Sequence, residues 1–365
     1  MSMRPIVAFV LGALAMSAPG GALLHAAPLQ DSTNRAPGAA DSVARPPAAV
    51  PLFSSEAPLD VTLTGNLGRL RRDKADGAPW RQGTIQYTET NGGTREVPLR
   101  MRTRGIWRLK NCDFPPLRFN FGSRAVRGTV FEGLDEPKMV NFCKDRDNYE
   151  QYVLQELQLY RMFALLTPVS HRARLLRTTY WDSARGATLT TRYAILVEEP
   201  DAMAARVGGR LIETKGAKAE DLDPYQAALV GVFQYLIGNH DWSTANLHNA
   251  ELVVMETVLP VPYDFDFSGA VNAVYATPDP NLPIRRVRDR LYRGHCVPEE
   301  HYNRVFALFR DRKEAIYALY ADEIGQLLEP RVVRETLEYY DRFYETLGSD
   351  RLRQRDILDR CQFSQ

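Results

Sequence analysis

The spacing of apolar residues changes near residue 147, and this change constrains the fold more than any other feature of the sequence. Before it, short segments alternate apolar and polar residues, as in LDVTLT (59–64) and VPLRMR (97–102), which is typical of strands with one buried face. From 147 to 166, apolar residues recur at the spacing of a helix. Two more strands are then expected, at 173–180 and 189–197.

Helical segments dominate the rest of the chain. The stretch PYQAALVGVFQYLI (224–237) is apolar on almost every side, which predicts a buried helix with Asp223 as its N-cap. Further amphipathic helices are expected near 299–312, 314–328 and 331–347. The sequence therefore predicts an α+β fold, with a β-rich part at 56–198 and a mainly helical part at 199–365.

The first 55 residues are predicted to lie outside this fold. Arg4 precedes a short apolar run, and small residues follow, so residues 1–27 have the features of a secretory signal peptide. Residues 28–55 are rich in Ala, Pro and Ser, which predicts a disordered linker. We therefore expect an exported protein, periplasmic or secreted, with no transmembrane segment in the mature chain. An uncleaved N-terminal anchor is the alternative.

The net charge and the cysteine content limit the kinds of partner that we expect and indicate whether the cysteines form disulfides. The net charge of +1 gives no reason to expect a nucleic-acid partner. Four cysteines in an exported chain allow two disulfides with three possible pairings. We favour Cys112 with Cys143, because both flank predicted strands of the β-rich part.

A polar stretch, GNHDWSTAN (238–246), directly follows the predicted buried helix. Calcineurin-like metallophosphoesterases use a Gly-Asn-His-Asp run to bind metals, but they also need D-x-H, G-D-x-x-D and G-H-x-H segments. The first two are missing here, and Gly294-His295 is followed by Cys296-Val297. Two metal ions would lack ligands in such a chain, which argues against this chemistry.

Phosphoryl transfer fits the same stretch better. Asp241 and Asn246 have the spacing of a catalytic-loop base and its metal-binding amide, and a predicted hairpin separates them from Asp264 and Asp266. We expect those two carboxylates to lie on one side of an extended strand. Oxygen ligands of this kind suit Mg²⁺ or Mn²⁺.

Three segments carry a resemblance to a known family. Arg104-Gly105-Ile106-Trp107 is followed by Phe114-Pro115, PYDFDFSG stands at 262–269, and Gly238-Asn239-His240-Asp241 leads to Asn246. Together these segments resemble the CotH kinase-like family and, more distantly, HipA-type kinases. The resemblance implies a two-lobed protein-kinase-like fold, with a β-rich N-lobe, a mainly helical C-lobe, and ATP between them.

The resemblance also implies roles for single residues. Asp241 would be the catalytic base and Asn246 a metal ligand, with Asp264 or Asp266 as the other, and the backbone of Glu198 or Glu199 would meet the adenine. The family's lysine pair after Pro115 is missing here. The sequence leaves Arg118, Lys138 and Lys144 as candidates for the phosphate-binding cation, and Glu156 as its acidic partner.

The resulting prediction is an exported, ATP-dependent phosphotransferase whose acceptor is a hydroxyl, with a protein as the expected substrate. ATP is scarce outside the cytoplasm, so a catalytically inactive envelope binding protein is one alternative. Transfer of AMP by the same residues is another.

Overall fold

The computed structural model describes residues 50–75 and 77–362. The predicted signal peptide and most of the predicted linker lie outside these residues. Of the linker, the short 3-10 helix η1 (Pro51–Ser54) is described, and its Leu52 is fully buried with the core of the strands. Among the described residues, no helix is both long and apolar enough to cross a membrane.

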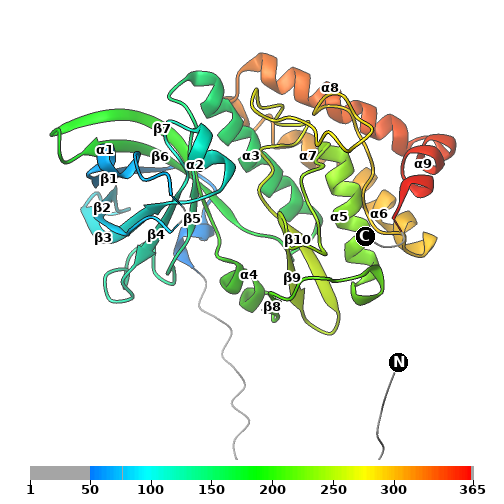
Figure 1. Cartoon of the computed structure of the whole chain (residues 1–365), viewed down its shortest axis with the longest axis horizontal. Helices are drawn as coiled ribbons and strands as arrows, with labels where there is room; N and C mark the ends of the chain where they lie inside the picture. The colour runs from blue at the N-terminus through cyan, green and yellow to red at the C-terminus, as the bar shows by residue number, and fades with distance from the viewer. Residues whose placement is uncertain (1–49, 76, 363–365) are drawn as a thin grey trace, which may run out of the picture. The chain divides into compact units, whose positions relative to one another are not determined.

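Seven strands form a closed barrel in the order β1-β2-β3-β4-β5-β7-β6 (Figure 1). Antiparallel pairing joins all neighbours except β1 and β6, which run parallel from Leu59 opposite Leu176 to Gly65 opposite Asp182. The strands are β1 (Leu59–Gly65), β2 (Arg81–Thr88), β3 (Thr94–Thr103), β4 (Leu117–Phe121), β5 (Lys138–Val140), β6 (Ala173–Asp182) and β7 (Ala187–Val197).

The predicted two-lobed protein-kinase-like fold is therefore wrong. A closed, mixed seven-stranded barrel stands where the β-rich N-lobe of a kinase-like fold was expected, and only the mixed α+β content agrees in general terms. The reason is the β1–β6 pairing, which joins segments far apart in the chain. Apolar periodicity reports which face of a strand is buried, and it carries no information about a distant partner strand.

Alternating apolar residues fill the interior of the barrel. In β4, Leu117, Phe119 and Phe121 are buried, while Arg118 and Asn120 are partly exposed. The predicted disulfide between Cys112 and Cys143 is confirmed, and it joins the segments before β4 and after β5.

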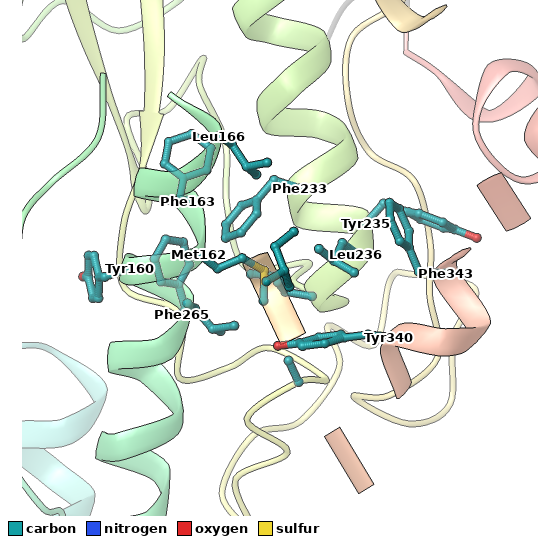
Figure 2. Close-up of a cluster of buried hydrophobic side chains, with 14 of the residues drawn as sticks. Tyr160, Met162, Phe163, Leu166, Phe233, Tyr235, Leu236, Phe265, Tyr340 and Phe343 are labelled. Carbon is teal, nitrogen blue, oxygen red and sulfur yellow. The ribbon is translucent and has the colours of Figure 1, made fainter. Parts of the chain in front are cut away.

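Helix α5 (Pro224–Ile237) is the centre of the helical part. Every residue from Gln226 to Ile237 is buried, as its apolar sequence predicts, and the carboxylate of Asp223 accepts a hydrogen bond from the Gln226 N–H at 2.8 Å. Helix α3 (Asp147–Leu166) contributes to the same core through its inner face (Figure 2). Around this pair lie α6 (Glu299–Asp311), α7 (Lys313–Ala318) and α8 (Pro330–Leu347), and α9 (Asp350–Asp356) packs against α8.

Smaller elements complete the described chain. A three-stranded sheet has the order β10-β9-β8, and a second disulfide joins Cys296 to Cys361. The remaining elements are α1 (Leu67–Leu70), α2 (Trp107–Asn111), α4 (Pro200–Arg206), β8 (Arg210–Ile212), η2 (Ala219–Asp221), β9 (Ala250–Val254), β10 (Val258–Pro262), η3 (Gly325–Leu327) and η4 (Leu358–Arg360).

Candidate functional site

The loop that carries Asp241 begins where α5 ends. Gly238 has a φ of 63°, a left-handed conformation that suits glycine and turns the chain away from the helix. The side-chain oxygen of Asn239 then accepts a hydrogen bond from the Asp241 N–H at 3.0 Å. A β-bridge between Ser243 and His248 closes the loop. These contacts fix the backbone on both sides of Asp241.

The carboxylate of Asp241 is held in place and yet accessible. Its Oδ1 lies 2.7 Å from Nε2 of His248, and its Oδ2 accepts a hydrogen bond from Nδ2 of Asn249 at 3.1 Å. The side chain remains 44% exposed. Asp241 and the exposed Asn246 line one cavity of about 610 Å³. Two donors therefore orient a carboxylate that a ligand in this cavity can reach.

Asp264 and Asp266 do not lie on a strand, contrary to the prediction. Strand β10 ends at Pro262, and Asp264 has a φ of 60°, so its backbone is in a turn conformation that a non-glycine residue adopts rarely. The Asp264 N–H donates a hydrogen bond to the Tyr160 hydroxyl at 3.0 Å. Phe265, between the two carboxylates, is fully buried in the helical core (Figure 2). The buried ring anchors the turn that presents Asp264 and Asp266.

Arg108, a residue of α2 that the sequence did not single out, lies among three carboxylates. Its Nη2 is 2.5 Å from Oδ2 of Asp266, 3.6 Å from Oε2 of Glu156 and 3.7 Å from Oδ1 of Asp264. Its Nε also donates to Oδ2 of Asp266 at 3.1 Å. The only signal in the sequence was the basic character of the segment after Gly105, and no local pattern connects that segment with α3.

Burial and neighbouring charges give the three carboxylates different pKa values. Burial raises the pKa of Glu156 to about 8 and that of Asp266 to about 6, against the attraction of Arg108. Burial acts in the same direction on Asp264, but the positive charges of Arg108 and Arg104 outweigh it and lower the pKa of Asp264. At neutral pH Asp264 is therefore the most firmly ionised of the three, and its side chain is 30% exposed.

The predicted phosphate-binding cations have other partners. Arg118 and Lys138 face each other across β4 and β5, with Arg118 3.5 Å from Glu136 and Lys138 3.7 Å from Glu251. Lys138 also lies 4.4 Å from the centre of the Tyr263 ring, and burial lowers its pKa. Glu156 thus pairs with Arg108, and a pairing with Arg118, Lys138 or Lys144, the three candidates from the sequence, is absent from the described ion pairs.

Lys144 and Glu198 have structural contacts as well. The Lys144 ammonium lies 6.0 Å from the centre of the Tyr149 ring. The carboxylate of Glu198 accepts hydrogen bonds from Arg172 and Arg206. Its backbone N–H donates to the Arg172 carbonyl, and its own carbonyl lies 3.0 Å from Nδ1 of His171. Both backbone groups of Glu198 already form hydrogen bonds within the protein. Neither is therefore free for the predicted contact with adenine.

The structure brings only part of the predicted metal site together. A backbone hydrogen bond from the Tyr263 N–H to the Asn249 carbonyl, 3.1 Å long, ties the Asp241 loop to the turn with Asp264. Within 50–75 and 77–362, however, no three His, Cys, Asp or Glu side chains are grouped so as to hold a metal ion. A cation at this site therefore needs further oxygens from a bound molecule.

Comparison with known proteins adds no relative. The chain matches no protein-family model, and neither the curated proteins nor the solved structures include one that is similar to it. The resemblance to the CotH kinase-like family consequently stays a prediction from three short segments.

Proposed function

We propose that this protein is an exported, metal-dependent phosphotransferase that moves a phosphoryl group from ATP to a hydroxyl. The observation that carries the proposal is the carboxylate of Asp241, which two donors orient on the wall of a cavity shared with Asn246. This proposal depends on the side chains of the site and does not use the overall fold.

Asp241 is the group to accept the proton of the acceptor hydroxyl. A general base must lie within hydrogen-bond reach of the proton it removes, and an oriented carboxylate open to a cavity meets this requirement. The Asn249 amide and the His248 imidazole keep its two oxygens in fixed directions. In phosphoryl transfer, such positioning accounts for much of the catalysis.

Asp264 and Asn246 are the side chains that would hold Mg²⁺ or Mn²⁺. Asp264 is ionised and partly exposed, and Mg²⁺ in proteins is commonly bound by one or two carboxylates together with substrate phosphates and water. Asp264 does not line the cavity that Asp241 and Asn246 share, so a cation on Asp264 would take most of its other oxygens from the nucleotide and from water. When bound, this cation would neutralise charge on the transferred phosphoryl group.

Two cations beside Asp264 fit the phosphates of a nucleotide. The positive charges of Arg104 and Lys138 both act on the Asp264 carboxylate, and burial lowers the pKa of each cation. The Nε atom of Arg104 is buried and has no hydrogen-bond partner among the described residues. Buried cations with few partners are stabilised by an anion, which a phosphate chain supplies.

The first test is a melting experiment with ATP and Mg²⁺ on the wild type and on Asp264→Ala. We expect the nucleotide to raise the Tm of the wild type only when Mg²⁺ is present, and to leave the variant nearly unchanged. Asp60→Ala, a change at an exposed carboxylate on the barrel, is the matched control and should behave as the wild type does. A wild type that shows no shift with the nucleotide would contradict the proposal.

A further inference from the structure

Arg108 stands where a metal-bound nucleotide would need free carboxylate oxygens. We propose that Arg108 is an internal cation that closes this site, and that α2 must shift before a divalent cation with its nucleotide can bind. This inference rests on the proposed function, because it concerns access to the same carboxylates. It adds a regulatory contact that the proposed chemistry does not require.

A divalent cation that took Asp266 as a ligand in addition to Asp264 could not bind while Arg108 keeps its present position. Both Nη2 and Nε of Arg108 bind the same oxygen, Oδ2 of Asp266, at 2.5 Å and 3.1 Å. Mg²⁺ bound to that oxygen would lie at about 2.0–2.1 Å and would repel a guanidinium at hydrogen-bond distance. Arg108 also lies 3.7 Å from Oδ1 of Asp264 and partly neutralises that carboxylate. A divalent cation therefore competes with Arg108 for the negative charge of Asp264 and Asp266.

The segment that carries Arg108 is built to move at one end. Helix α2 has five residues and no side-chain hydrogen bond at its N-cap, Ile106. Gly105 precedes it with a φ of 94°, and Ile106 is 82% exposed. At the other end, Cys112 follows the helix and is bound to Cys143. A displacement of Arg108 thus takes the form of a pivot between Gly105 and the disulfide.

Aromatic rings hold α2 in the closed position. The ring of Trp107 lies 5.7 Å from that of Phe267 and 5.2 Å from that of Tyr275, both in the segment that follows Asp266. Each contact of this kind is weak compared with a buried ion pair. The closed state therefore has a modest stabilisation that ligand binding can overcome.

A second position for Arg108 is available after the shift. Glu156 is 1% exposed, and its Oε1 has no hydrogen-bond partner among the described residues. A guanidinium that leaves Asp266 and turns toward Glu156 would satisfy this buried oxygen, while Asp264 and Asp266 become free for the cation. The carboxylate without a partner is thus an independent sign that the cluster accommodates two arrangements.

The test is a calorimetric titration of the full chain with Mn²⁺ and a non-hydrolysable ATP analogue. Arg108→Gln should bind the pair at least about tenfold more tightly than the wild type, since coupling of this kind typically changes affinity by factors of about 5–150. Trp107→Ala leaves every charge in place and should also tighten binding. Lys110→Gln removes an exposed positive charge from the same helix and should bind as the wild type does.

The outcomes separate this inference from the proposed function. If Arg108→Gln and Trp107→Ala both bind the nucleotide no more tightly than the wild type does, the role of Arg108 as an internal cation is overturned. Binding by the wild type in the same experiment would still support the proposed function. If no variant binds the nucleotide with Mn²⁺, both ideas are overturned. Melting curves without ligand identify any variant that has lost its fold, and Trp107→Ala keeps the test decisive if Arg108→Gln is unfolded.

Discussion

Nε2 of His248 lies 2.7 Å from Oδ1 of Asp241, and this hydrogen bond joins the two ends of one loop. The carboxylate raises the pKa of His248, chiefly through the hydrogen bond itself. The imidazole therefore carries a positive charge over a wider pH range than an unpaired histidine does. Its position beside the proposed base makes His248 the most direct reporter of the state of Asp241.

We predict that His248 titrates above its ordinary pKa of 6.5 in the wild type and returns toward that value in Asp241→Asn. The amide of the variant has no charge to stabilise the imidazolium. Since the folded-state pKa is the higher one, the pair stabilises the fold fully below the ordinary pKa and loses this effect as pH rises through the raised value. NMR of the imidazole C–H signals of His248 in the wild type and in Asp241→Asn measures the titration.

Glu156→Gln should change the pH dependence of stability. Burial raises the pKa of Glu156 to about 8, so the folded protein keeps a proton that the unfolded chain releases near the ordinary value of 4.5. The wild type therefore loses stability as pH rises from about 4.5 to about 8, and the glutamine variant lacks this loss. Urea unfolding at pH 5 and pH 8 measures the free energy of unfolding of both proteins. Relative to the wild type, the variant should be more stable at pH 8 than it is at pH 5. A constant difference between the two would show that Glu156 is already ionised at pH 5.

Removal of the Cys112–Cys143 disulfide should destabilise the fold by about 3–4 kcal/mol, because it closes a loop of moderate length. The Cys112→Ser, Cys143→Ser double variant tests this by chemical denaturation. The double variant of the other pair, Cys296→Ser with Cys361→Ser, is the matched comparison, and its longer loop predicts a cost that is slightly larger. A cost near zero for the first pair would contradict the anchoring of α2 that we describe.

Phe265→Ala should damage both the core and the site. The ring is fully buried against Tyr160 and Phe233, with centroid distances of 4.9 Å and 5.6 Å. Loss of such a ring costs about 3–5 kcal/mol. The turn with Asp264 and Asp266 then loses its anchor, so nucleotide binding should weaken as well. Phe265→Leu keeps most of the apolar volume and should lose less of both, as denaturation and calorimetry would show.

The long helices were predictable because their signal is local, whereas the helix expected near 314–328 ends at Ala318 and is followed by the separate 3-10 helix η3. The apolar spacing gives α3 at 147–166 and α5 at 224–237, the same bounds that the structure shows. The strands were located for the same reason, because alternation marks a buried face. The closed barrel was not predictable, since the parallel pairing of β1 with β6 leaves no trace in either segment alone.

The arrangement of the candidate site was predictable only where its residues are close in the sequence. Asp241 and Asn246 share one short loop, and they line one cavity in the structure. Arg108 was missed because its partners, Glu156 and Asp266, come from distant segments. The positive φ of Asp264 was missed too, because nothing in the sequence distinguishes an aspartate just after a strand from one within it. The ion pairs of the site thus join residues that are far apart in the sequence, and only the folded structure shows which cation pairs with which carboxylate.

The most direct test of the proposed function follows label from ATP in the wild type and in Asp241→Asn. The account predicts that the wild type transfers label from the γ position, to itself or to an added protein with accessible hydroxyl groups, and transfers none from the α position. Asp241→Asn should bind ATP with Mg²⁺ about as well and transfer label at least about a hundredfold more slowly, as expected for loss of a general base. Equal transfer by the variant, or transfer from the α position, would contradict the account.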